Sequence, residues 1–233
     1  MSARRALALL GTAAFVLIAP RSARDATAAK LEHTLWVGHQ FVEGRRVVPI
    51  LGPLRTRTDT YVIARVRRRG GRIELEQRTC RVDFAKVAGG KVRLSDRGVA
   101  ALPSARITFR PHQSRLLYAA PWRVGWGSED IDRDGKPGMT IRVDAPLCGG
   151  TLQVASRTTS VARGQRRGEL FVGQVAVTVR QRILGASGRC LRLVARDSKD
   201  SMIGHFAYRR VPAGTTCSDL ARRPWPVRAP RSL

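Results

Sequence analysis

The sequence predicts an all-β protein, a single-domain antiparallel β-barrel or β-sandwich with one long irregular loop between two groups of strands. From about residue 34 onward, apolar and polar residues alternate with a period of two over most of the chain. Gly and Pro residues separate these alternating stretches, as turns separate antiparallel strands. Signals for helices are few, and the absence of any repeat of about 20–50 residues argues against solenoids and propellers.

Residues 1–28 have the organisation of a secretory signal peptide. Two arginines precede an apolar run at residues 6–19, and a segment of small residues then ends in Ala26-Thr27-Ala28. This order predicts cleavage after Ala28. The apolar run of about 14 residues is short for a membrane-spanning helix, so we expect no transmembrane segment once the signal is removed. The sequence therefore predicts an exported protein, periplasmic or extracellular.

The first predicted group of strands, at 34–109, contains two clear alternating stretches. In "YVIARV", Val62, Ala64 and Val66 lie on one face of the predicted strand. In "RIELE", apolar residues alternate with glutamates. Strands with one packed face and one wet face are typical of antiparallel sheets.

A second group of strands is predicted at 139–211. There, "ELFVGQVAVTVRQRIL" places Phe171 and Val175 on the same face as two further valines. The segment at about 110–138 separates the two groups, and we expect it to be irregular because it holds prolines, aromatic residues and a cluster of acids.

Residues 29–218 are assigned to the all-β domain. Within it, a single helical turn is predicted at 96–102, "DRGVAAL". Residues 219–233 form a basic, Pro-rich C-terminal tail, which we expect to fray.

The chain carries 43 Lys and Arg residues against 17 Asp and Glu, a formal net charge of +26. Such a balance favours anionic partners, for example lipid phosphates or polysaccharide. Most of the basic residues are scattered at alternate strand positions, which is also the pattern of solvated strand faces, and we do not predict nucleic acid as a partner. One dense cluster lies at a predicted hairpin tip and is the expected anionic-surface patch. We call its members the hairpin arginines: Arg67, Arg68, Arg69 and Arg72.

Four cysteines remain after the signal peptide: Cys80, Cys148, Cys190 and Cys217. In an exported chain an even number of cysteines predicts disulfides, and four of them allow three connectivities. We expect Cys190 to pair with Cys217, which would anchor the C-terminal region, and Cys80 to pair with Cys148. Because no His lies at a zinc-site spacing from them, we predict no zinc.

Acidic residues cluster in "GSEDIDRDGKPGM", residues 127–139, which we call the acidic loop. Asp130, Asp132 and Asp134 alternate, and a glycine follows. Side chains at positions 1, 3 and 5 of such a loop converge on a hard cation, glycine at position 6 permits a sharp turn, and position 7, here Lys136, supplies its backbone carbonyl. Carboxylates this close repel one another unless a cation lies between them, which predicts calcium. The alternative is a solvated acidic turn paired with nearby arginines.

The stretch "DIDRDGKPGMTIRV" resembles the DxDxDG calcium loop of FG-GAP and VCBS repeats, which leads directly into a strand. The resemblance covers about 14 residues, occurs once and implies that Asp130, Asp132, Asp134 and the backbone of Lys136 hold calcium. The sequence departs from those repeats at Gly138, where they have an aspartate. The missing ligand predicts weak affinity, on the order of millimolar, and a structural role for the ion.

Four aromatic residues are candidates to line a cavity for a small apolar ligand: Trp36, Tyr118, Trp122 and Trp126. A closed barrel of about eight strands can hold one such ligand. The alternative is that these side chains cap the core.

No catalytic motif is found. The histidines lie outside any metalloprotease helix or nucleophile motif, and no phosphate-cradling loop or dinucleotide fingerprint occurs. We therefore predict an exported, non-catalytic β-domain with one calcium-stabilised loop, acting as a binding or structural module of the cell envelope or exterior. Two alternatives stay open: a barrel that carries a small apolar ligand, and a binder of anionic surfaces such as lipid phosphate or polysaccharide.

Overall fold

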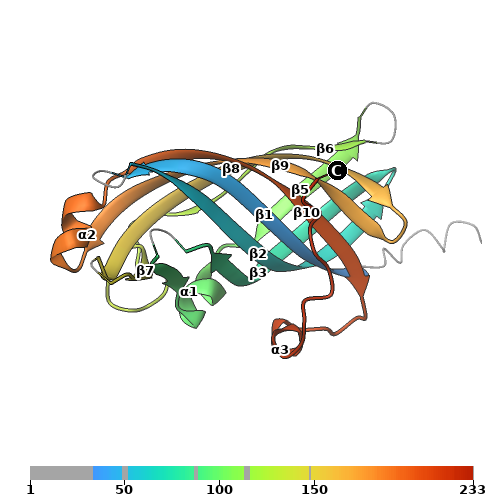
Figure 1. Ribbon diagram of the computed structural model, residues 1–233. Coiled ribbons are helices and arrows are strands. Elements are labelled where there is room, and N and C mark those ends of the chain that lie inside the picture. The colour runs from blue at the N-terminus through green and yellow to red at the C-terminus, as the bar shows by residue number, and fades with distance from the viewer. Residues whose placement is uncertain (1–33, 49–51, 87–88, 113–115, 147, 233) are drawn as a thin grey trace, which may run out of the picture. The chain divides into compact units, whose positions relative to one another are not determined.

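The computed structural model describes residues 34–48, 52–86, 89–112, 116–146 and 148–232, so the expected signal peptide lies outside the described residues. The strands are β1 (Thr34–Val48), β2 (Gly52–Arg69), β3 (Arg72–Phe84), β4 (Lys91–Leu94), β5 (Ala105–Pro111), β6 (Leu117–Trp126), β7 (Met139–Asp144), β8 (Gly150–Arg167), β9 (Leu170–Ala186) and β10 (Ser198–Val211). They form one antiparallel sheet in the order β4-β7-β8-β6-β5-β3-β2-β1-β10-β9. Because β8 also pairs with β9, the strands from β8 to β9 in that order close into a barrel (Figure 1). The all-β fold class is confirmed, and of its two forms the structure is the barrel.

The segment expected to be irregular is shorter than the sequence indicated, because β6 occupies its middle. This strand pairs with β5 on one side and with β8 on the other. Its register against β8 shifts between Ala119 and Trp122, and Pro121 lies within that shift. Proline is tolerated at such an irregularity because no ladder hydrogen bond is required of it there. The prolines and aromatic residues that suggested a loop therefore belong to a bulged strand.

The inward-facing side chains fill the barrel. The buried interior cluster includes Trp36, Val62, Ala64, Val66, Ile73, Leu75, Ile107, Phe109, Phe171, Val175, Val177, Phe206 and Tyr208. The ring centroid of Phe171 lies 4.9 Å from that of Phe109 and 5.5 Å from that of Phe206. A Cβ atom at Gly173 would lie only 2.4 Å from the Phe206 ring, so the phenylalanines occupy the space that this glycine leaves. The interior is a packed core, as in other small barrels.

The helices of the described residues are short: α1 (Asp96–Ala101), α2 (Arg189–Val194) and α3 (Cys217–Ala221). The predicted turn at 96–102 is confirmed as α1, where the Ser95 side chain accepts a hydrogen bond from the Gly98 backbone N–H at 2.9 Å. Helices α2 and α3, of six and five residues, were not predicted. None of the helices in the described ranges has the length and apolar character needed to cross a membrane.

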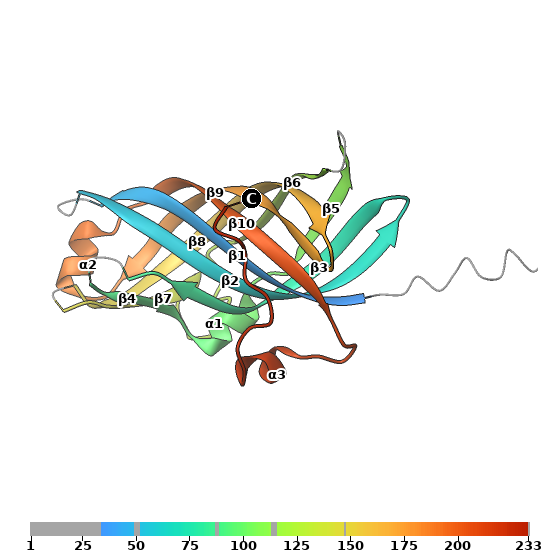
Figure 2. The same ribbon diagram turned by 45° about the vertical axis from the view of Figure 1, so that its right-hand side comes forward.

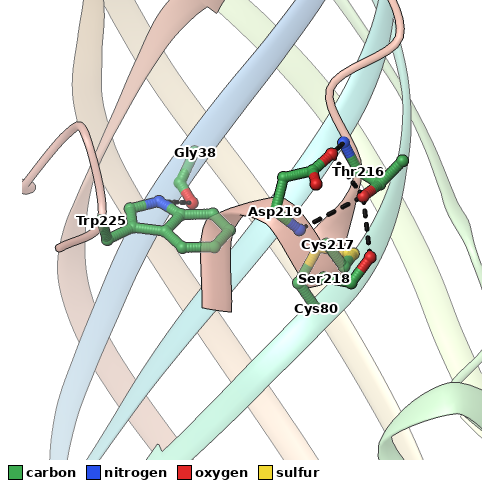
Figure 3. The surroundings of a disulfide bond; sticks show 7 residues. All are labelled: Gly38, Cys80, Thr216, Cys217, Ser218, Asp219 and Trp225. Atoms are coloured by element: carbon green, nitrogen blue, oxygen red, sulfur yellow. Dashed lines mark hydrogen bonds between the residues drawn. A yellow bond between two sulfur atoms is a disulfide. The ribbon is translucent and has the colours of Figure 1, made fainter. Parts of the chain in front are cut away.

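The end of the chain lies against the outside of the barrel (Figure 2). We call residues 217–232 the C-terminal segment. Trp225 and Val227, which are 7% and 5% exposed, pack with outward-facing residues of β1 and β2. The indole Nε1 of Trp225 donates a hydrogen bond to the carbonyl oxygen of Gly38 at 3.1 Å (Figure 3). The expectation that the tail would fray is wrong for residues 219–232, because apolar side chains alternate with prolines and arginines there and are buried against the barrel.

Both disulfides differ from the expected pairing: they are Cys80–Cys217 and Cys148–Cys190. The prediction that all four cysteines form disulfides is confirmed, and the prediction of their partners was wrong. Cys80 lies on β3 and Cys217 opens α3, so this disulfide fastens the C-terminal segment to the barrel (Figure 3). Cys148 precedes β8 and Cys190 follows β9, and the pairing of these two strands brings both cysteines to the same end.

Candidate functional site

The acidic loop joins β6 to β7 and draws three carboxylates together. One oxygen from each of Asp130, Asp132 and Asp134 lies within 4.8 Å of the others. The carboxylate of Asp130 accepts hydrogen bonds from the backbone N–H groups of Asp134 and Gly135, at 3.0 and 2.8 Å. The backbone N–H of Lys136 donates to Asp134 Oδ1 at 3.0 Å. The turn closes at Gly135, whose φ of +82° favours glycine. The three aspartate side chains therefore lie close together within this turn, as the sequence predicted.

Asp132 is the buried member of this cluster, with 4% of its surface exposed. Its Oδ2 accepts a hydrogen bond from the Thr140 backbone N–H at 3.1 Å, whereas its Oδ1 is buried without a partner. Within the described residues, none of the three aspartates pairs with an arginine or lysine, and Asp130 and Asp134 are exposed, as the alternative of a solvated turn expects. A buried carboxylate oxygen without a donor or cation is costly. This all-oxygen donor set suits a hard cation such as calcium.

The hairpin arginines lie at the β2–β3 turn, as the sequence predicted, and Arg69 is paired with Arg72. Arg68 lies between Arg67 and Arg69 on β2, and its side chain contacts the interior cluster. Its guanidinium carbon lies 5.1 Å from the ring centroid of Trp36, which faces inward. Burial and the charges of two further arginines lower the pKa of Arg68. The four arginines therefore do not form one flat patch.

The four aromatic candidates do not surround one cavity in the part of the chain that is described. Trp36 belongs to the packed interior, and Trp122 packs against the same cluster. The Trp126 indole donates a hydrogen bond to the carbonyl oxygen of Val154 at 2.7 Å. Tyr118 is 43% exposed. These residues are distributed between core and surface.

A groove on the outside of the barrel was not identified from the sequence. It crosses β6, β8, β9 and β10 and has a volume of about 780 Å³. We call it the wall groove; it is lined by Arg123, Arg157, Thr159, Thr178, Arg180 and Lys199. Within the described ranges, its four cationic side chains have no carboxylate partner. The sequence shows these residues at alternate strand positions, but only the order of strands in the barrel brings them together.

A buried histidine lies beneath the C-terminal segment. His39 Nε2 is 2.9 Å from Asp59 Oδ1, and His39 Nδ1 accepts a hydrogen bond from the Ala229 backbone N–H at 2.9 Å. Because Nδ1 accepts, the ring proton lies on Nε2 and is donated to Asp59. Burial lowers the pKa of His39, and the hydrogen bond to Asp59 only partly offsets this effect. Sequence reasoning did not single out this pair, whose members lie on neighbouring strands.

Comparison with known proteins gives little further information. No protein-family model and no curated protein matches the sequence. Among solved structures, the chain is similar to Neisserial surface protein A (NspA), with 8% identity and a TM-score of 0.44 over 76% of this chain and 97% of that chain. So distant a similarity carries no inference about what this chain does. The resemblance of the acidic loop to FG-GAP and VCBS repeats is limited to a short motif.

Proposed function

We propose that the protein is an exported, non-catalytic β-barrel that binds anionic surfaces through the outside of the barrel. The observation that carries this proposal is the division of side chains between the two faces of the sheet. The interior cluster is apolar and packed, and beyond it the inward-facing Arg46 bonds to Asp200 and Gln181, so the interior is occupied where a small apolar ligand would have to be held. Cationic side chains without carboxylate partners in the described residues line the wall groove on the outside. This division favours an anionic partner over an enclosed ligand.

The disulfides support an extracytoplasmic location. Such bonds form and persist in oxidising compartments and are rare in the cytosol. Together with the expected signal peptide, they favour the periplasm or the exterior, where a basic surface meets the phosphate and sulfate groups of the cell envelope.

The non-catalytic part of the proposal is supported by the pair His39 and Asp59. A histidine that acts as a general base directs one ring nitrogen at the substrate and the other at the group that orients it. Here Asp59 is the group that holds Nε2, the Ala229 backbone N–H occupies Nδ1, which a substrate would need, and His39 is 3% exposed. The arrangement serves to hold the C-terminal segment.

We also propose that the acidic loop holds a structural calcium ion. Asp130, Asp132 and Asp134 would supply side-chain oxygens and Lys136 its backbone carbonyl. Support comes from the convergent carboxylates and from the unpartnered Oδ1 of Asp132. The loop leads into Met139, the fully buried first residue of β7, so an ion there would fix the entry of the chain into the sheet.

Calorimetric titration of chelator-treated protein tests the calcium proposal. We expect a heat of binding with an affinity on the order of millimolar, and a melting temperature that rises with calcium. Asp132→Asn should remove both effects. Asp83→Asn, at a carboxylate on β3 that is 51% exposed, is the matched control and should retain them. No heat at several millimolar calcium would contradict the proposal.

Sedimentation with lipid vesicles tests the proposed function. We expect binding to phosphatidylglycerol vesicles and not to phosphatidylcholine vesicles, and we expect it to weaken as sodium chloride screens the charges. Equal sedimentation with both vesicles contradicts it, and so does a failure to bind either phosphatidylglycerol vesicles or heparin. Native mass spectrometry checks the carrier alternative, because a small apolar ligand that co-purifies would favour that function instead.

A further inference from the structure

We infer that the wall groove is a binding site for anionic lipids, with the lipid phosphate over its cations and the start of the acyl chains over an apolar row beside it. This inference rests on the proposed function and names its site and ligand class. Three successive rows of outward-facing side chains on β8, β9 and β10 carry it.

The first row consists of cations. Arg157 on β8 is the direct cross-strand partner of Arg180 on β9, and Arg180 is the direct partner of Lys199 on β10. Neighbouring strands are about 4.8 Å apart, and like charges at directly opposite positions destabilise a sheet. All three side chains are exposed, and none pairs with a carboxylate in the described part of the chain. An anion bound over the row would relieve this repulsion and accept charge-assisted hydrogen bonds.

The second row adds hydroxyl groups. Thr159, Thr178 and Ser201 are paired across β8, β9 and β10, about 7 Å along the strands from the cations. Arg123 on β6 stands directly opposite Thr159 and extends the row. Hydroxyls and guanidinium groups both donate hydrogen bonds to phosphate oxygens. No carboxylate lines the groove, so a phosphate would meet donors and positive charge only.

The third row is apolar. Val161, Ala176 and Ile203 are paired across the same strands, one step beyond the hydroxyls. Ile203 is 68% exposed, which is unusual for a large apolar side chain in the described residues. A polyanionic polysaccharide would use the cations but would leave this row unmatched. In a lipid the phosphate is followed by hydrocarbon, just as the rows of cations and hydroxyls are followed by the apolar row. The groove therefore fits a lipid better than a polysaccharide.

The test compares two triple variants of the full, disulfide-bonded protein on phosphatidylglycerol vesicles. Arg157→Gln, Arg180→Gln and Lys199→Gln remove the cation row. The control removes the same charge on β2 and β3, away from the groove, with Arg55→Gln, Arg65→Gln and Arg78→Gln, which are exposed and lie outside the hairpin arginines. We expect affinity to fall on the order of 100-fold for the groove variant and only a few-fold for the control. Circular dichroism and thermal melting confirm that both variants fold, as exposed substitutions should.

Each outcome bears on the inference separately from the proposed function. If the wild-type protein binds neither phosphatidylglycerol vesicles nor heparin, both are wrong. If it binds heparin and not vesicles, the lipid inference is wrong and the proposed function stands. If both triple variants lose affinity equally, binding depends on net charge and the groove is not the site. If the groove variant loses heparin binding but keeps vesicle binding, the ligand is a polysaccharide and the lipid assignment is wrong.

A single variant tests the apolar row and leaves the charges in place. Ile203→Ser should weaken binding to phosphatidylglycerol vesicles several-fold and leave retention on heparin unchanged, because only a lipid offers hydrocarbon to this side chain. Unchanged vesicle binding by Ile203→Ser would overturn the assignment of the acyl chains to this row.

Discussion

The backbone N–H of Ala229 donates a 2.9 Å hydrogen bond to Nδ1 of His39, a residue 190 positions earlier in the chain. This bond requires an unprotonated Nδ1, and the other ring nitrogen is held by Asp59. The docking of the C-terminal segment on the barrel is therefore tied to the neutral form of one imidazole. Arg57 and Arg228, whose charges also lower the pKa of His39, favour the same form.

Acidification should therefore destabilise the protein. The pKa of His39 is lowered in the folded state from the usual value of 6.5, so the unfolded state binds more protons between the two values. The contribution of His39 to the free energy of unfolding is complete above pH 6.5 and is lost as the pH falls below it. We expect the melting temperature to fall from about pH 7.5 to about pH 5.5. The carboxyl of Asp59, whose pKa is also lowered, adds its own loss only below its usual 3.8.

A variant isolates this effect from other groups. His39→Phe keeps an aromatic ring but cannot titrate, so the difference in melting temperature between the two pH values should shrink. A nuclear magnetic resonance titration should place the His39 pKa below 6.5. An unshifted or raised pKa contradicts the assignment of Nδ1 as acceptor.

Truncating Trp225 should loosen the C-terminal segment. The side chain is 7% exposed, its ring lies edge-on to Tyr61 at 5.2 Å between centroids, and it bonds to Gly38. Trp225→Ala should lower the free energy of unfolding by about 3 kcal/mol in urea denaturation. Arg223→Ala, an exposed neighbour in the same segment, should change it by less than about 0.5 kcal/mol. Equal effects would mean that the indole does not anchor the segment.

The disulfide between Cys80 and Cys217 should stabilise the docking of the C-terminal segment on the barrel. Peptide mapping under non-reducing conditions should recover Cys80 linked to Cys217 and Cys148 linked to Cys190. Replacing both Cys80 and Cys217 by alanine should lower the free energy of unfolding by about 2–5 kcal/mol and expose the end of the chain to proteases. Recovery of a peptide that links Cys80 to Cys148 would contradict the fold at this end.

The filled interior predicts that added volume is not tolerated. Gly173→Ala would place its methyl group 2.4 Å from the Phe206 ring and 2.1 Å from the carbonyl oxygen of Arg163. Overpacking of this kind should cost about 1–3 kcal/mol in the free energy of unfolding. Ala176→Ser, at an exposed outward position of the same strand, is the control. A stable Gly173→Ala variant would indicate unfilled space within the barrel.

Local patterns predicted the strands well. Val62, Ala64 and Val66 were placed on one face by alternation alone, and they belong to the interior cluster. The helical turn at 96–102 was also readable, because serine stands just before it as an N-cap. The capping box of α3, formed by Thr216 and Asp219, is a similar signal that the sequence reading missed.

Partners distant in the chain were not predictable, because they depend on the order of strands. Cys80 meets Cys217 only because the C-terminal segment lies across the outside of the barrel. Arg157 meets Arg180 across a hairpin, but Lys199 joins them only because β10 pairs with β9. The wall groove thus arises from topology, whereas the hairpin arginines stood out because they lie close together in the sequence.

We propose that the outside of the barrel contacts an anionic partner at the wall groove. Titration of isotope-labelled protein with short-chain phosphatidylglycerol, followed by nuclear magnetic resonance, tests this claim most directly. The side-chain Nε–H signals of Arg157 and Arg180 and the methyl signals of Ile203 should shift, while those of Arg69 and Arg72 stay in place. Shifts confined to the hairpin arginines, or to methyl groups of the interior cluster, would contradict the account.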